Sequence, residues 1–131
     1  MPDVRVTTDR LELIAGTVEL ARLEISNRAA FSRILDAHVP DHWPPPLENA
    51  DTMALNLRRL EEAPDQAGGW TWYLVLRHDA TGARVLVGAT GFKGKPTSDG
   101  MVELGYSVLK EAQGRGYATE AVKGLLAWAF E

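Results

Sequence analysis

The residues with the clearest chemical potential lie in the segment Lys110-Glu-Ala-Gln-Gly-Arg-Gly-Tyr-Ala-Thr-Glu120. Two glycines, Gly114 and Gly116, precede a predicted helix, and the first turn of a helix leaves about four backbone N–H groups without intrahelical acceptors. The helix dipole adds roughly half a positive charge there, and glycine admits a ligand because it has no Cβ. These features predict an anion site suited to a phosphate or pyrophosphate, with Arg115 as a supplementary charge.

Composition limits the class of protein. The 131 residues suit a single domain spanning 1–131. A formal charge of −4 disfavours a nucleic-acid-binding protein, which would carry a basic stripe. The chain has no cysteine, and His38, His42 and His78 lack metal-ligand spacing, so no metal is expected. No secretory signal or run of about 18 apolar residues is visible, so we expect a cytoplasmic protein without membrane contact.

The first half of the chain predicts mainly helices. A short strand is expected at 11–14 after a polar arm, and a helix should begin after Thr17, which is a typical N-cap residue. Apolar spacing predicts a second helix at about 27–37 and a third at 48–62. The segment 39–46 contains four prolines and is therefore predicted to be a loop.

The second half of the chain predicts strands followed by a helix. Aromatic and branched residues at 70–76 and 85–92, joined by a short polar turn, indicate an antiparallel hairpin, and 101–109 adds a third strand. The last helix should open at Gly114-Arg-Gly116 and run to the chain end. This order indicates an α+β domain with a mostly antiparallel mixed sheet flanked by helices.

The last helix has no stop signal. Neither glycine nor proline follows it, and Glu131 places a carboxylate where the helix dipole favours a cation. The apolar segment 125–130 also requires a covering surface. Three interpretations stay open: a naturally frayed terminus, a fragment whose domain is incomplete, or a homodimer in which a second copy completes the sheet.

The segment Gln113-Gly-Arg-Gly-Tyr-Ala118 fits Gln/Arg-x-x-Gly-x-Gly/Ala, the acetyl-coenzyme-A signature of GNAT-type N-acetyltransferases, and the chain resembles this family. The segments 8–13, 103–109 and 118–122 resemble the branch that acetylates ribosomal-protein N-termini. The resemblance implies a GNAT-like acyl-CoA N-acyltransferase fold, apparently truncated after the cofactor-binding helix. It also implies acetyl-CoA as co-substrate and an amine as acceptor.

The resemblance further implies which residues bind the cofactor. The backbone N–H groups from Gln113 to Ala118 would hold the pyrophosphate, and the strand from Tyr106 to Leu109 would bind the pantetheine arm. A backbone N–H of Val108 or Ser107 is the candidate oxyanion donor. The cofactor-binding candidates are Tyr106, Ser107, Val108, Leu109, Gln113, Gly114, Arg115, Gly116, Tyr117 and Ala118.

Acetyl transfer requires a neutral amine. A lysine-like amine has a pKa of about 10.4 and an α-amino group about 7.7–8.0, so an α-amino acceptor loses its proton more easily near neutral pH. A base within hydrogen-bond reach would assist. Glu103, on the strand that runs toward the thioester, is the candidate general base, and the alternative is a Glu103 that faces solvent or pairs with an arginine.

The acceptor is the least determined part of the prediction. We expect acetyl transfer to a primary amine, either a protein N-terminus or a small molecule. A non-catalytic coenzyme-A-binding module or an inactive fragment is the alternative. The resemblance implies that Trp43, in the proline-rich loop, forms one wall of the acceptor pocket, and the competing interpretation is a buried hydrophobic plug.

Overall fold

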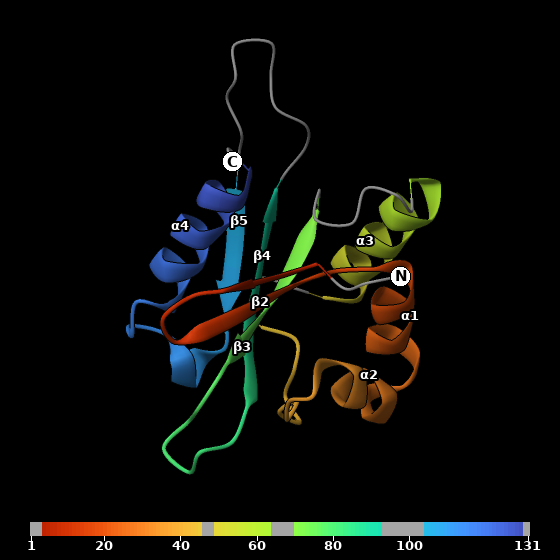
Figure 1. The fold of residues 1–131 in the computed structure, drawn as a ribbon. Coiled ribbons are helices and arrows are strands. Elements are labelled where there is room, and N and C mark those ends of the chain that lie inside the picture. The colour runs from red at the N-terminus through yellow and green to blue at the C-terminus, as the bar shows by residue number, and fades with distance from the viewer. Residues whose placement is uncertain (1–3, 46–48, 64–69, 93–103, 130–131) are drawn as a thin grey trace.

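A computed structural model describes residues 4–45, 49–63, 70–92 and 104–129, which form an antiparallel sheet between two layers of helices (Figure 1). The strands lie side by side in chain order: β1 (Arg5–Thr7), β2 (Leu11–Ala15), β3 (Thr71–Leu76), β4 (Val85–Phe92) and β5 (Leu104–Val108). On one side of the sheet lie α1 (Val18–Ser26), α2 (Arg28–Leu35) and α3 (Ala50–Glu62), and on the other lies α4 (Tyr117–Ala129).

Side chains at the helix ends explain where the first three helices begin. Thr17 caps α1 and Asn27 caps α2, each accepting a backbone N–H at 3.1 Å. Helix α3 begins with a capping box formed by Asn49 and Thr52. The three helices predicted for the first half of the chain are therefore confirmed, and α2 ends early because Asp36 adopts a left-handed conformation.

The sheet confirms the predicted three-strand meander and adds one strand. Strand β3 pairs antiparallel with β4, and β4 pairs antiparallel with β5. Strand β2 also pairs directly with β3, although three helices separate the two strands in the sequence. The polar segment before residue 11 contains a further strand, because Arg5–Thr7 forms β1 and pairs antiparallel with β2. The last strand of the predicted meander was expected at 101–109. Residues 104–108 form β5, and residues 101–103 lie outside the described residues.

The start of the last helix differs from the prediction. Gly114 and Gly116 have φ angles of +76° and +81°, which are outside the helical region, so both glycines lie in the turn before α4. Helix α4 itself begins at Tyr117. A short 3₁₀ helix, η2 (Lys110–Ala112), connects β5 to this turn.

Each face of the sheet carries an apolar core. Because successive strand residues point to opposite faces, Tyr73 packs edge to face on Phe31 of α2 with ring centroids 5.1 Å apart, while Trp72 packs on Trp128 of α4 at 4.9 Å. Other fully buried residues are Ile14, Leu20, Leu35, Val75 and Leu86 toward α1 and α2, and Leu11, Leu13, Leu74, Ala121 and Leu125 toward α4.

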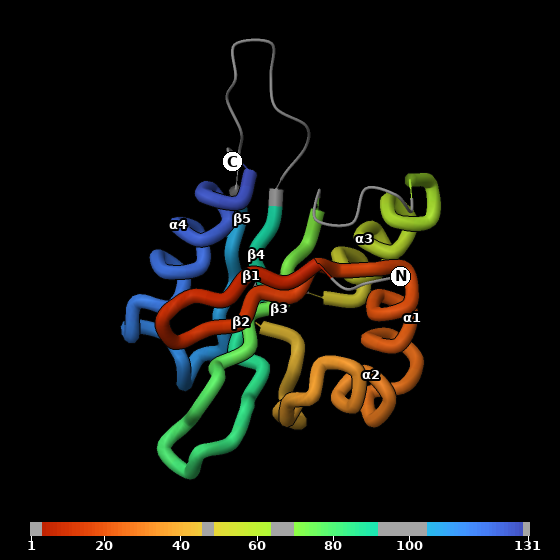
Figure 2. Tube along the Cα trace, viewed as in Figure 1, coloured from red at the N-terminus to blue at the C-terminus, as the bar shows by residue number. Residues whose placement is uncertain are grey.

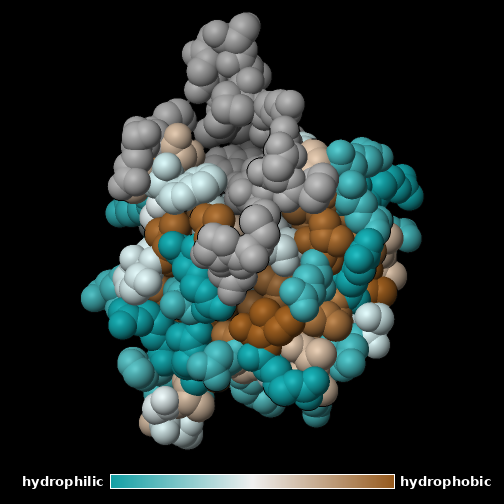
Figure 3. Space-filling view, turned by 45° about the vertical axis from the view of Figure 1, so that its right-hand side comes forward, coloured by the Kyte–Doolittle hydropathy of each residue, from teal (hydrophilic) through white to brown (hydrophobic). Residues whose placement is uncertain are grey.

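Hydrophobic surface also reaches the exterior. In Figure 3, brown hydrophobic surface gathers near the middle of the face turned toward the viewer, with teal hydrophilic surface around it. Ile25 of α1 and Leu55 of α3 are among the exposed large hydrophobic residues, at 47% and 40% exposure. The helices therefore leave part of their apolar surface uncovered. No helix among the described residues is long and apolar enough to cross a membrane.

The close approach of β4 to β5 predicts a cost for enlarging Gly88. A Cβ at Gly88 would lie 2.6 Å from the carbonyl oxygen of Ser107, which is backbone and cannot move unless β5 moves. We expect Gly88→Ala to lower the free energy of unfolding by about 1–3 kcal/mol, measured by urea unfolding. Ala80→Ser, in an exposed turn, should change it by less than about 0.5 kcal/mol. Equal stability of the two variants would contradict this packing.

Candidate functional site

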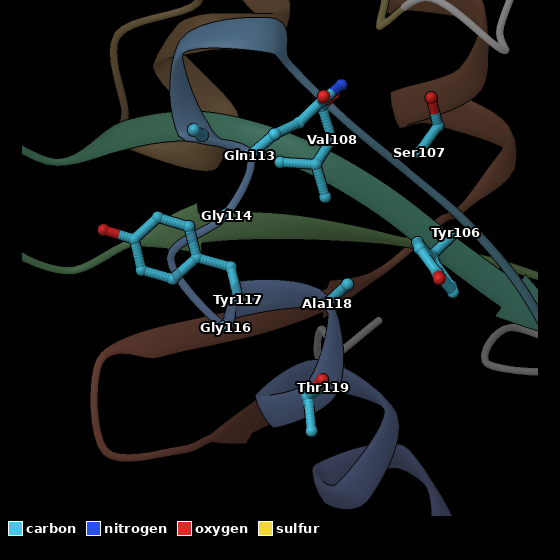
Figure 4. A pocket seen from close by; sticks show the side chains of 10 residues that line it. Tyr106, Ser107, Val108, Gln113, Gly114, Gly116, Tyr117, Ala118 and Thr119 are labelled. Atoms are coloured by element: carbon cyan, nitrogen blue, oxygen red, sulfur yellow. The ribbon is translucent and has the colours of Figure 1, made fainter.

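A pocket opens between β5 and the first turn of α4 (Figure 4), with a volume of about 400 Å³. This volume is within the usual range for small-molecule sites. Every predicted cofactor-binding residue except Leu109 and Arg115 lines it, and Ala112 and Thr119 line it without having been predicted. The full lining is Tyr106, Ser107, Val108, Ala112, Gln113, Gly114, Gly116, Tyr117, Ala118 and Thr119.

Leu109 and Arg115 point elsewhere. The Leu109 side chain is 1% exposed and belongs to the core on the α1 and α2 side of the sheet. Arg115 is exposed, and its Nε donates to the carbonyl of Glu111 at 3.4 Å. The structure therefore does not bring the Arg115 guanidinium into the lining of the pocket.

The turn before α4 presents backbone N–H groups to the pocket. Within the described part of the chain, the N–H groups from Gly114 to Thr119 have no hydrogen-bond acceptor, and the first bond back into the turn runs from Glu120 N to Gly116 O at 3.0 Å. Unpaired N–H groups at a helix N-terminus carry partial positive charge. The turn can therefore bind an anion such as a phosphate without any basic side chain.

The outer edge of β5 offers further backbone groups. Leu109 N donates to Val87 O of β4 at 2.8 Å, and antiparallel pairing alternates along a strand, so Ser107 also faces β4 while Val108 faces outward. The outward carbonyl of Val108 accepts from the Gln113 side-chain amide at 3.0 Å. Of the two predicted oxyanion donors, the geometry therefore favours the N–H of Val108.

A clamp from the other end of the chain holds this turn in place. The Glu120 carboxylate accepts hydrogen bonds from the Thr8 hydroxyl at 2.5 Å, from Arg10 N at 2.8 Å and from Arg10 Nε at 2.7 Å. Arg10 Nη1 also donates to Arg115 O at 2.8 Å, and its guanidinium lies 4.7 Å from the centre of the Tyr117 ring. Figure 2 shows the β1–β2 turn beside the start of α4.

The clamp also changes the acidity of Glu120. Partial burial by itself would raise the pKa of Glu120, but hydrogen bonds from Thr8 and from the backbone and side chain of Arg10 outweigh it and lower the pKa below its usual value. No local pattern in the sequence signals this clamp, because its partners lie at opposite ends of the chain.

The candidate base Glu103 lies outside the described residues. His42, one of the three histidines without metal-ligand spacing, pairs with Glu111 at 2.7 Å on the surface and joins the proline-rich loop to η2. Among the described residues, His, Asp and Glu form no cluster of three that could hold a metal ion.

Comparison with known proteins gives the family. The model for the acetyltransferase (GNAT) domain matches residues 17–131. Over 130 residues the chain is 43% identical to YjdG of Bacillus subtilis strain 168, which is described as an uncharacterized N-acetyltransferase, and the match covers 96% of this chain and 72% of that protein. The chain belongs to the GNAT family of acetyltransferases, which transfer acetyl groups from acetyl-CoA.

Solved structures show the same fold. A Vibrio cholerae protein named as a candidate ribosomal-protein-serine acetyltransferase is 21% identical, with a TM-score of 0.57 over 99% of this chain and 68% of that chain. An Agrobacterium tumefaciens acetyltransferase is 24% identical, with a TM-score of 0.52 over 100% of this chain and 68% of that one. The predicted GNAT resemblance and the α+β fold are thereby confirmed.

The clamp predicts a stability that depends on pH. Because the pKa of Glu120 is lowered in the folded state, its stabilisation is complete above the unfolded-state pKa of about 4.3 and is lost as the pH falls through the folded-state value. We expect Glu120→Gln to lower the free energy of unfolding by about 1–2 kcal/mol near neutral pH, with the difference from wild type shrinking below about pH 4. Urea unfolding across this range measures both effects.

Glu61→Gln is the matched control for this experiment. Glu61 forms an exposed ion pair with Arg22 at 2.8 Å, so its loss should cost less than about 1 kcal/mol. A Glu120 variant that is no less stable than the Glu61 variant would contradict the clamp.

Proposed function

We propose that the chain transfers the acetyl group of acetyl-CoA to a primary amine, and that the turn before α4 holds the diphosphate of the cofactor. The observation that carries this proposal is the run of N–H groups from Gly114 to Thr119 that have no acceptor among the described residues, in a segment where every residue except Arg115 lines the pocket. A diphosphate is the anion that such a turn binds well.

The two glycines support this fit because both adopt φ angles that residues with side chains rarely adopt. At Gly116 a Cβ would meet Arg10 Nη2 at 3.3 Å, and the φ angle of +81° is one that residues with side chains rarely adopt. At Gly114 the φ angle is +76°, and no atom lies within 4 Å of the Cβ position. Open space beside a bare backbone is what close contact with an anion requires.

The edge of β5 is the proposed place for the pantetheine arm. Bound acetyl-CoA supplies the thioester that the amine attacks. The outward N–H of Val108 would stabilise the negative charge that develops on the thioester oxygen, since a fixed backbone dipole needs no reorganisation during the reaction. The hydrogen bond from the Gln113 side chain to the Val108 carbonyl holds the next peptide unit along the same edge of β5.

Glu103 completes the proposal as the general base. In the sequence, Glu103 immediately precedes Leu104, the first residue of β5. Its carboxylate would accept a proton from the incoming ammonium group, directly or through one water. An α-amino group is the favoured acceptor, because with a pKa of about 7.7–8.0 about half or more of it is neutral at pH 8, whereas a lysine-like amine with a pKa of about 10.4 is almost fully protonated.

The diphosphate site predicts that a side chain at Gly116 blocks binding. We expect Gly116→Glu to weaken acetyl-CoA binding by at least about tenfold, or 1.4 kcal/mol, because the side chain brings bulk and like charge to the turn. Isothermal titration calorimetry measures the affinity. Gly82→Glu is the matched control, since Gly82 has a similar φ of +85° but lies in a remote turn. Equal affinity of the two variants would reject the site.

The general base predicts a specific pH dependence. We expect Glu103→Gln to slow acetyl transfer mainly below about pH 8, where the acceptor amine is still protonated. The measurement is the ratio of mutant to wild-type kcat/KM across pH. Glu62→Gln, at the exposed end of α3, should leave that ratio near one. A ratio for Glu103→Gln that does not vary with pH would remove this residue from the mechanism.

A further inference from the structure

Arg10 contacts the turn before α4 without lining the pocket. It belongs to the β1–β2 turn, and its Nη1 donates to the carbonyl oxygen of Arg115 at 2.8 Å. Arg115 lies between Gly114 and Gly116, so this contact acts at the centre of the turn. The lining of the pocket includes both glycines but not Arg10. The guanidinium is therefore placed to act on the turn from outside the pocket.

The carbonyl that Arg10 binds shares a peptide unit with the N–H of Gly116. Among the described residues only the Trp43–Pro44 peptide is cis, so this unit is trans, and a planar trans peptide points its C=O and its N–H in opposite directions. Because the C=O points toward Arg10, the N–H of Gly116 points away from it. That N–H has no acceptor among the described residues, and Gly116 lines the pocket. The bond from Arg10 thus fixes the direction of an amide that is available to an anion.

Two further contacts hold the Arg10 guanidinium in this position. Its Nε donates to the Glu120 carboxylate at 2.7 Å, and its plane lies 4.7 Å from the centre of the Tyr117 ring. Its Nη2 lies 3.3 Å from the position that a Cβ at residue 116 would take, so glycine leaves the guanidinium room beside the backbone. A planar fork of donors makes these contacts at once, whereas the single ammonium group of a lysine does not.

These contacts favour an action through the peptide unit over direct binding of a phosphate. The charge of Arg10 is already paired with Glu120 at 2.7 Å, and the guanidinium is not part of the lining. A hydrogen bond to the carbonyl of a peptide polarises that peptide and strengthens the donor at its other end. Arg10 therefore influences an anion in the pocket through the N–H of Gly116.

We propose that Arg10 is a positioning residue for the cofactor diphosphate, because it holds the peptide between Arg115 and Gly116 with the Gly116 N–H turned toward the pocket. The identity of the anion in this inference rests on the proposed function. Arg10 then affects the binding of the diphosphate and leaves the binding of the pantetheine arm at β5 unchanged. This difference separates an oriented amide from a general support of the fold.

Two ligands that differ in the diphosphate test this role. We expect Arg10→Met to weaken acetyl-CoA binding by about tenfold in isothermal titration calorimetry. S-acetylpantetheine carries the same thioester arm without the diphosphate, and its affinity, followed by the Val108 amide resonance in ¹H–¹⁵N NMR spectra, should change by less than about twofold. Equal weakening of both ligands would mean that Arg10 supports only the fold, and would overturn the inference.

Arg77→Met is the matched control, because Arg77 holds the same β1–β2 turn. Its Nη1 donates to Thr8 O at 3.3 Å and to Asp9 O at 3.5 Å. We expect this variant to bind acetyl-CoA within about twofold of wild type, even where its melting temperature falls. If Arg77→Met weakened acetyl-CoA binding as much as Arg10→Met, a loosened β1–β2 turn would explain both variants and the role of Arg10 would be rejected.

Arg10→Lys separates orientation from charge and serves as the second variant if Arg10→Met does not fold. Lysine keeps the positive charge but lacks the fork that joins Arg115 O to Glu120, so we expect acetyl-CoA binding to weaken by at least about fivefold. The Gly116 ¹⁵N resonance of the free protein should also shift, because the carbonyl of its peptide loses a charged donor. Full affinity or an unchanged Gly116 resonance in Arg10→Lys would contradict the proposed orientation.

The outcomes also distinguish this inference from the proposed function. Tight acetyl-CoA binding by wild type and by both Arg10 variants would overturn the inference and leave the proposed function standing. If wild type does not bind acetyl-CoA, the proposed function fails, and adenosine diphosphate becomes the probe of the turn. A saturable shift of the Gly116 resonance by this probe that is lost in Arg10→Lys would still support the role of Arg10, whereas no shift in wild type would overturn both.

Discussion

The arrangement of this site depends on backbone N–H groups that the fold leaves without partners. A helix cannot satisfy the amides of its own first turn, and here the turn from Gly114 to Gly116 extends that set toward the pocket. Both glycines have positive φ angles, a backbone conformation that residues with side chains rarely adopt. The anion site that we propose is therefore built from backbone groups, and the Arg115 side chain is not part of the lining of the pocket.

A geometry of this kind requires support from outside the turn. Glu120 supplies it, because its carboxylate joins the first turn of α4 to Thr8 and Arg10 of the β1–β2 turn. The N-terminal strands thus have a function beyond enlarging the sheet, since they fix the position of the helix that carries the amides. The described residues that line the pocket include no basic side chain, and the Thr8–Arg10–Glu120 cluster supports the turn from outside this lining.

The sheet also separates this pocket from a second, much smaller cavity. The pocket lies between β5 and α4 and offers hydrogen-bond donors from the backbone, whereas the small cavity, of about 10 Å³, lies beneath α1 and α3. Trp43 of the proline-rich loop lines the small cavity, where it is buried and its Nε1 donates to Glu24 at 2.9 Å. Ala89 of the small cavity pairs with Ser107 of the pocket across neighbouring strands.

The sequence by itself determined the elements and the glycine-rich turn, because helix caps, strand patterns and Gly114-x-Gly116 are local signals that the chain carries whatever its surroundings. It did not determine strand β1, which is polar and is defined only by pairing with β2. It also could not decide whether Val108 or Ser107 supplies the proposed oxyanion donor, because that depends on which of the two N–H groups is hydrogen-bonded to β4. The Glu120 clamp was decided by tertiary structure alone, because it joins residues from opposite ends of the chain whose meeting no local pattern encodes.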